Sequence, residues 1–124
     1  MKKFGKGSVL VISAVAALTV ALTGAFGGPA AATATTVGVT AGKPSEFKFI
    51  LSKKAVAKGL VTFKVVNQGM IAHDFKIAGK KTPSLQRGKT STLKVTFKKA
   101  GKYPYLCTLP SHAPAGMKGV LVVK

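Results

Sequence analysis

The sequence predicts an all-β fold, a Greek-key sandwich or barrel of about seven to eight strands. Three observations indicate this. Apolar and polar residues alternate in short segments, turn-forming residues separate these segments at regular intervals, and no segment after residue 34 has the periodicity of a helix. An antiparallel arrangement of the strands is expected, in a single domain without internal repeats.

The strands can be placed in order by their alternation and by the turns between them. In the third strand Val61, Phe63 and Val65 lie opposite polar residues, and the same period of two recurs over residues 93–97. The predicted strands are residues 36–40, 47–51, 60–67, 73–78, 92–97, 102–108 and 118–123. Glycine, proline or asparagine marks turns at residues 42–44, 58–59, 67–69, 79–88 and 100–101. Residues 79–89 are polar and basic, and we expect them to form a surface loop.

The first 34 residues differ in composition from the remainder. Basic residues within 2–6 precede an apolar run over residues 9–25, and small residues follow as far as Ala34. This order predicts a secretory signal over residues 1–34 and a domain over residues 35–124, exported to the periplasm or the extracellular space. The alternative is an uncleaved anchor that keeps the protein at the membrane, because a run of about 17 residues reaches the lower limit for crossing a bilayer.

After residue 34 the chain is strongly basic. Seventeen lysines and arginines oppose only Glu46 and Asp74, which gives a formal charge of +15. Such a charge predicts partners with acidic surfaces, or association with an anionic membrane surface. Nucleic acid is disfavoured, because the lysines are spread over strands and turns and Arg87 is the only arginine. A solvated cationic surface without a docking role is the alternative.

Four residues carry the chemistry of the sequence: His73, Cys107, His112 and Met117. They include both histidines and the only cysteine. The last three follow one another at intervals of five residues, and His73 begins another predicted strand 34 residues before Cys107. A sandwich can bring two such strand ends together at one pole. Two imidazoles, one thiolate and one thioether are the ligand set of a mononuclear blue-copper site.

Taken singly, each of these residues could have a role that involves no metal. A lone histidine is more often a hydrogen-bonded residue than a ligand, and a lone cysteine can be a small buried hydrophobe. Met117 and Met70 could both pack in a core, and we assign Met70 to that role. Zinc is the rival metal, but structural zinc sites contain no thioether. An oxidase is excluded, because further copper centres would need histidines that the chain lacks.

The segment from Tyr103 to Cys107, together with residues 117–123, resembles the cupredoxin family of small blue copper proteins, which includes plastocyanin and azurin. The resemblance extends over the whole domain. The Cys-x4-His-x4-Met spacing is most similar to that of rusticyanin and auracyanin. One departure is Asp74, where many members have an asparagine that ties the two ligand segments together. An aspartate can still accept a hydrogen bond there, for example from the Thr108 hydroxyl or a loop N–H.

The resemblance implies a cupredoxin-like Greek-key sandwich that holds one type 1 copper ion. His73, Cys107 and His112 would be the trigonal ligands and Met117 the axial ligand. The expected function is that of a monomeric, non-enzymatic one-electron carrier between redox proteins with acidic docking surfaces. Electrons would pass through His112 within an apolar patch of loop residues, namely Leu109, Pro110, Ala113, Pro114 and Ala115. The alternative is a copper-binding protein for copper delivery or sequestration.

Overall fold

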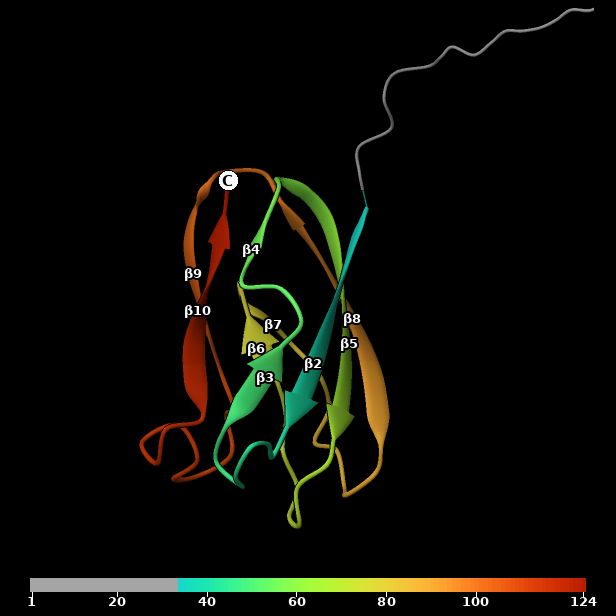
Figure 1. Ribbon diagram of the computed structural model, residues 1–124, viewed down its shortest axis with the longest axis vertical. Coiled ribbons are helices and arrows are strands. Elements are labelled where there is room, and N and C mark those ends of the chain that lie inside the picture. The colour runs from blue at the N-terminus through green and yellow to red at the C-terminus, as the bar shows by residue number, and fades with distance from the viewer. Residues whose placement is uncertain (1–33) are drawn as a thin grey trace, which may run out of the picture. The chain divides into compact units, whose positions relative to one another are not determined.

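Two β-sheets pack face to face in this computed structural model, which describes residues 34–124 (Figure 1). One sheet has the strand order β3-β2-β5-β8 and the other β4-β10-β9-β6-β7. The strands are β2 (Thr35–Ala41), β3 (Phe49–Leu51), β4 (Ala55–Val56), β5 (Gly59–Asn67), β6 (Lys76–Ile77), β7 (Lys80–Lys81), β8 (Thr90–Phe97), β9 (Gly101–Leu106) and β10 (Lys118–Val123). The predicted all-β sandwich is confirmed. Within residues 34–124 no helix is long and apolar enough to span a membrane, and the predicted signal segment falls, except for Ala34, outside the described residues.

The sheets are mixed, so the expected antiparallel arrangement is wrong at two places. Strand β2 pairs in parallel with β5, and β4 pairs in parallel with β10. The reason is the path of the chain between β3 and β5. It leaves the first sheet to add β4 to the second, and then returns as β5 in the same direction as β2. Such a crossover is what a parallel pair requires.

The segment after His73 forms less sheet than the sequence predicts. The expected strand over residues 73–78 is reduced to β6, which pairs with β9 only through Lys76 and Ile77. The next residue of β9 is Pro104, which has no N–H to extend the ladder, and Ala78 turns the chain at a φ of 52°. The predicted loop over residues 79–89 also contains β7. Strands β4 and β7 were missed because two residues are too few to show an alternation.

Aromatic side chains fill the core beneath one end of the sandwich. Phe75 is fully buried, and its ring lies 5.4 Å from Phe49, 5.3 Å from Phe63 and 5.5 Å from Tyr105, measured between centroids. The predicted inward residues Val61, Phe63 and Val65 are buried as well. Aromatic rings in such edge-to-face and tilted contacts contribute beyond the area that they bury. They therefore fix the chain two residues after His73 against both sheets.

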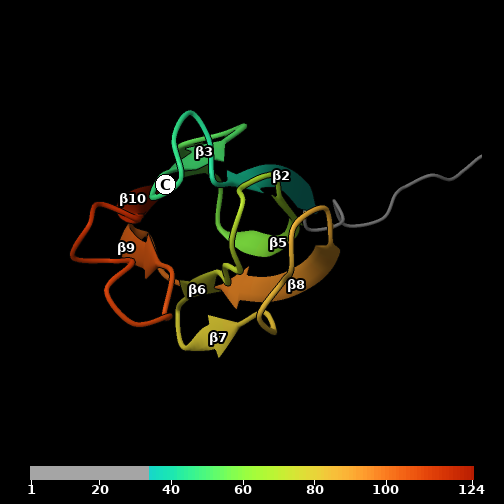
Figure 2. The same cartoon turned by 90° about the horizontal axis from the view of Figure 1, so that it is seen from below.

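Four connections gather at that end, which we call the site pole. They are residues 42–48, 68–75, 82–89 and 107–117 (Figure 1). In Figure 2 these loops lie around the end of the barrel that faces the viewer, while the carboxyl terminus lies at the opposite end in Figure 1. Every predicted ligand belongs to a connection at the site pole.

Candidate metal centre

The two segments that carry the predicted ligands reach the site pole from neighbouring parts of the second sheet. His73 forms an isolated bridge with Leu85, in which its N–H donates to the Leu85 carbonyl at 3.1 Å and its own carbonyl accepts at 2.8 Å. Cys107 directly follows β9, and His112 lies in the turn that leads to β10. The strand ends therefore meet as the sequence predicts.

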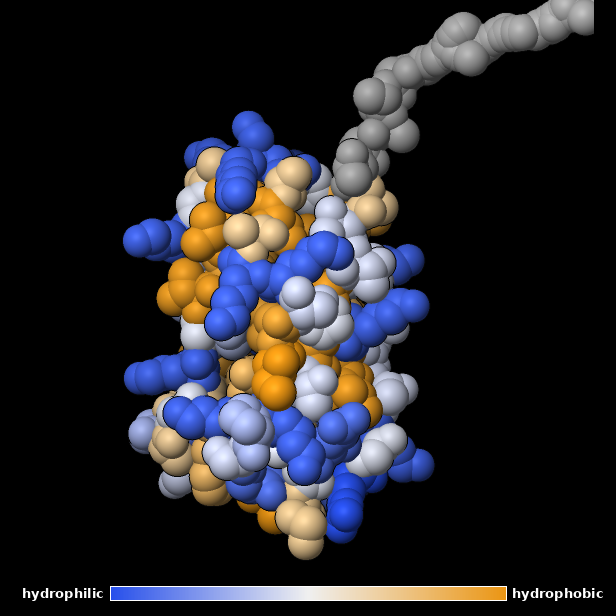
Figure 3. Space-filling view, viewed as in Figure 1, coloured by the Kyte–Doolittle hydropathy of each residue, from blue (hydrophilic) through white to orange (hydrophobic). Residues whose placement is uncertain are grey.

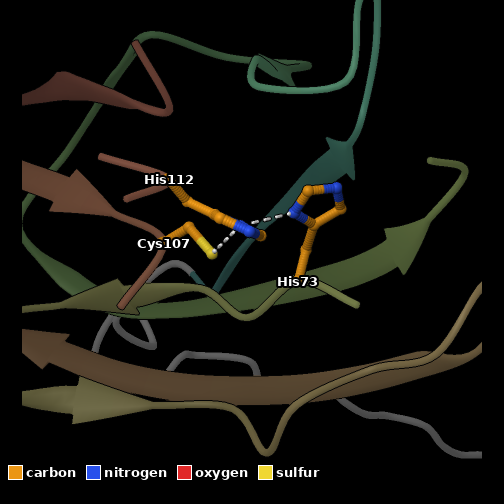
Figure 4. A group of neighbouring side chains, drawn as sticks. All are labelled: His73, Cys107 and His112. Carbon is orange, nitrogen blue, oxygen red and sulfur yellow. Dashed lines mark hydrogen bonds between the residues drawn. The ribbon is translucent and has the colours of Figure 1, made fainter. Parts of the chain in front are cut away.

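Three donor atoms converge in the interior of the site pole. His73 Nδ1 lies 3.2 Å from His112 Nδ1, and His112 Nδ1 lies 3.3 Å from Cys107 Sγ. One donor atom from each of the three residues lies within 4.8 Å of the other two. In Figure 4 Cys107 and His112 approach from one side and His73 from the other. This convergence from separate segments is what a single bound ion requires.

Met117 belongs to the same buried pole. Its side chain is fully buried in a small apolar cluster with Cys107 and Ala41, which Phe47 and Leu109 cover in part. The structure thus brings together all four residues that the sequence predicts as ligands. His112 is the most accessible of the four, with 9% of its surface exposed.

Backbone hydrogen bonds close the loop between Cys107 and Met117. The Cys107 N–H donates to the Met117 carbonyl and the Met117 N–H to the His112 carbonyl, each at 3.1 Å. Ser111 has a φ of 69°, an uncommon value for a residue other than glycine, which lets the turn tighten before His112. The positions of the three side chains are consequently coupled through the loop backbone.

The loop before His73 is organised by Asn67, a fully buried residue at the end of β5. Its Nδ2 donates to the carbonyls of Ile71 at 2.8 Å and Leu85 at 2.7 Å, and its Oδ1 accepts the Gly69 N–H at 2.8 Å. A buried amide with all of these partners is well satisfied. Asn67 therefore fixes both the loop before His73 and the Leu85 backbone to which His73 is hydrogen-bonded.

The sulfur of Cys107 lies in a buried, hydrogen-bonded environment. The Asp74 N–H donates to Sγ at 3.5 Å. Burial raises the pKa of the thiol and outweighs the hydrogen bonds from the Asp74 and Leu109 N–H groups, which lower it. The Asp74 carboxylate also raises the pKa of the thiol, through its charge and a side-chain hydrogen bond. The same carboxylate accepts the Thr108 N–H at 2.6 Å, together with the Thr108 hydroxyl. Both hydrogen bonds were predicted from the sequence as alternatives.

The environment of His112 favours the protonation state that a metal ligand needs. Burial lowers the pKa of its imidazole, and the neighbouring His73 lowers it further. These effects favour the neutral form of the ring, which is the form that binds a metal. Phe47 packs against this ring in an edge-to-face arrangement, with centroids 5.0 Å apart.

Sequence reasoning missed Glu46, whose Oε2 lies 2.6 Å from His73 Nε2. The only signal was compositional, since Glu46 is one of two acidic residues in a strongly basic domain.

The assignment of Met70 to the core was wrong, because 70% of its surface is exposed. Residues 68–72 leave the sheet as a loop that Asn67 and Glu46 hold by hydrogen bonds, so Met70 has no apolar layer to enter.

The donor set fits copper. Two imidazole nitrogens and one cysteine sulfur converge, and a buried thioether lies beside them. A thioether is a soft donor that structural zinc sites lack, whereas type 1 copper sites combine it with two histidines and a cysteine. The cluster of His73, Cys107, His112 and Met117 is thus typical of a type 1 copper site. A β-sandwich with such a cluster at one pole defines the class of the small blue copper proteins.

Comparison with known proteins agrees with this class. The family model described as "Cupredoxin-like domain" matches residues 10–123, so the chain belongs to the cupredoxin family. No curated protein matches the sequence.

Solved structures with the same fold are auracyanins and rusticyanin. Auracyanin B is 22% identical with a TM-score of 0.65, and the match covers 77% of this chain and 92% of that one. Auracyanin A, a "blue" copper protein from the bacterium Chloroflexus aurantiacus, is 23% identical with a TM-score of 0.65, covering 74% and 100%. Rusticyanin from Thiobacillus ferrooxidans is 22% identical with a TM-score of 0.63, covering 73% and 77%. These are the two groups that the ligand spacing indicates.

Proposed function

We propose that this protein is an exported electron carrier with one type 1 copper ion. His73, Cys107 and His112 would hold the ion as trigonal ligands and Met117 as the weak axial ligand. When bound, the ion supplies one-electron chemistry by cycling between Cu(II) and Cu(I). The observation that carries the proposal is the convergence of two imidazoles and the thiol in a buried pole, beside a buried thioether.

The surroundings of the site suit electron transfer because they resist movement. The ligand loop is closed by its own backbone hydrogen bonds, and Asn67 fixes the loop before His73. Close packing around a site opposes rearrangement when its charge changes. A site for copper delivery would instead need accessible ligands that an acceptor can reach, and all four candidate ligands here are buried.

His112 is the proposed exit for the electron. It is the most accessible candidate ligand, and it lies in a turn whose apolar residues Leu109, Pro110 and Ala113 are exposed or half-buried. An apolar surface around a partly accessible ligand allows a partner to approach closely with little desolvation of charge. This surface is the proposed contact for a redox partner.

The charge of the domain favours a partner with an acidic docking surface. The lysines of residues 34–124 are exposed, and hydrophilic residues are spread over the face shown in Figure 3. The side-chain carboxylates of Glu46 and Asp74 are both engaged in the site pole. Opposite charges accelerate the encounter of two proteins, and salt screens this effect. The same surface would also attract anionic membrane lipids.

Addition of Cu(II) to the purified domain tests the copper site. Intense visible absorption and an electron paramagnetic resonance spectrum with a small copper hyperfine splitting are expected, together with reversible reduction. A copper form without intense visible absorption would overturn the proposal. Rapid handover of Cu(I) to a chelator, without electron exchange, would instead indicate delivery or sequestration.

Reduction and oxidation by small reagents test the electron-transfer surface. The reduced protein is expected to react faster with an anionic oxidant, hexacyanoferrate(III), than with a cationic cobalt(III) complex once the driving forces are matched. Rising salt should slow the first reaction and speed the second.

Export would be checked by the mass of the secreted protein, which should begin at Thr35.

A further inference from the structure

Glu46 is hydrogen-bonded to a candidate ligand and to the loop that precedes this ligand. Its Oε2 lies 2.6 Å from His73 Nε2, and its two oxygens accept the Met70 N–H at 2.8 and 3.0 Å. Oε2 also accepts the Ile71 N–H at 3.3 Å. One carboxylate thus joins three parts of the site pole: its own turn after β2, the loop over residues 68–72, and the imidazole of His73.

The contact determines which nitrogen of His73 carries the proton. An ionised carboxylate can only accept hydrogen bonds, so the proton of a neutral His73 ring resides on Nε2. Nδ1 is then free of hydrogen, and this is the atom that lies 3.2 Å from His112 Nδ1 in the centre of the site. A carboxylate that fixes the tautomer of a metal-binding histidine also increases the donor strength of the ring.

The backbone around Glu46 leaves room for this contact. A side chain on Gly69 would overlap the Glu46 carboxylate, and its Cβ would lie 2.8 Å from His73 Nε2. Gly42, at a φ of 84°, packs its backbone against Gly69 so closely that a Cβ would collide there. Two glycines therefore let the turn and the loop approach until the carboxylate reaches the imidazole.

The other acidic residue of the domain does not take this role. Asp74 directs its carboxylate to Thr108, and its nearest cation is Lys81, with Nζ 3.8 Å from Oδ2. Among residues 34–124, Glu46 is the carboxylate within hydrogen-bonding distance of a candidate ligand imidazole.

We propose that Glu46 is a positioning residue that holds His73 in the tautomer with Nδ1 directed into the site and that lowers the reduction potential of copper bound there. The second part rests on the proposed function. The Glu46 carboxylate lies next to Nε2 of His73, the nitrogen that is not directed into the site. Its negative charge stabilises Cu(II), the more highly charged state, over Cu(I), and this lowers the reduction potential. The first part concerns the metal-free protein and stands without copper.

Two substitutions separate position from charge. Glu46→Gln keeps an acceptor oxygen and removes the charge, whereas Gly69→Ala keeps the charge and displaces the carboxylate. Nitrogen-15 NMR of the metal-free protein at neutral pH reads the His73 tautomer directly. We expect the Nε2–H tautomer in the wild type and in Glu46→Gln, and a mixture of tautomers in Gly69→Ala and Glu46→Ala.

The copper-loaded variants test the second part. Glu46→Gln is expected to shift the potential upward with little change in the visible spectrum. Glu46→Ala should weaken Cu(II) binding about 10- to 100-fold. Lys48→Gln serves as a control for general surface charge and should shift the potential slightly downward, an effect that salt removes.

The two parts of the proposal can be contradicted independently of each other. An unchanged tautomer in Glu46→Ala and Gly69→Ala would overturn the positioning role, whether or not copper binds. An unchanged potential in Glu46→Gln would overturn the tuning role. If the wild type shows the expected tautomer but forms no type 1 copper spectrum, the proposed function fails and the positioning role survives.

Discussion

Asp74 ties the segment of the first candidate ligand to the segment of the second through Thr108. Its carboxylate accepts the Thr108 N–H at 2.6 Å and the Thr108 hydroxyl through its other oxygen, while its own N–H donates to Cys107 Sγ. Asp74 follows His73 and Thr108 follows Cys107, so this pair of residues fixes the spacing of the ligand segments. Hydrogen bonds to a charged acceptor are stronger than those between neutral groups.

Substitution of Asp74 should therefore destabilise the domain. Asp74→Ala is expected to lower the free energy of unfolding by about 1–3 kcal/mol, because the hydrogen bonds from Thr108 to the buried, charged carboxylate are lost. Asp74→Asn keeps one oxygen for the Thr108 N–H and should cost less. Urea unfolding of the metal-free protein measures both. Lys81→Gln is the control for the ion pair with half-exposed Lys81, which should contribute less than about 1 kcal/mol. Equal stability of Asp74→Ala and the wild type would contradict the tie.

The part of the site that could be predicted depended on residue types whose chemistry is restricted. Histidine, cysteine and methionine at Cys-x4-His-x4-Met spacing match few functions besides type 1 copper. The role of Asp74 could be anticipated because it lies next to His73 in sequence. The strands with several alternating residues, such as β5 and β8, could likewise be predicted from their period of two.

Glu46 could not be found in this way because its contact with His73 is made in space. The two residues lie 27 positions apart, and they meet only because Gly42 and Gly69 let two loops touch. The exposure of Met70 was equally hidden, since it depends on the hydrogen bonds that Asn67 makes to the loop. The parallel pairing of β4 was missed because two residues carry no periodicity.

Acidification is expected to destabilise the metal-free protein in two steps. Burial lowers the pKa of His112 below its ordinary value of 6.5. Below that pH the unfolded chain binds a proton that the folded chain does not yet accept, so the free energy of unfolding falls.

The second step involves Glu46. Burial alone would raise the pKa of its carboxyl, but hydrogen bonds from the Met70 N–H, His73 and the Ile71 N–H outweigh this effect and hold the pKa below 4.5. The stabilisation is present above pH 4.5 and is lost as the pH falls through the folded-state pKa. Urea unfolding between about pH 7.5 and 3.5 measures both steps. His112→Gln should remove the first step and Glu46→Gln the second; a wild-type stability that does not change with pH would contradict the expectation.

Cys107→Ser should abolish the intense visible absorption of the copper form. The hydroxyl is nearly the same size as the thiol, but its oxygen cannot provide the charge-transfer bond that a thiolate makes to copper. Absorption spectroscopy after addition of Cu(II) is the measurement, and urea unfolding of the metal-free variant checks that it is folded. A folded variant with the wild-type spectrum would refute the assignment of Cys107 as a ligand.

Met117→Leu should keep both copper and colour but raise the reduction potential. Leucine fills nearly the same volume, so the buried cluster with Cys107 and Ala41 should lose less than about 1.5 kcal/mol. The potential should rise because a weak axial donor that favours Cu(II) is lost while the other three ligands remain. Voltammetry measures the shift. Met70→Leu is the matched control, since it removes a thioether from an exposed residue and should change neither spectrum nor potential. A lowered potential in Met117→Leu, or an equal shift in Met70→Leu, would argue against Met117 as the axial ligand.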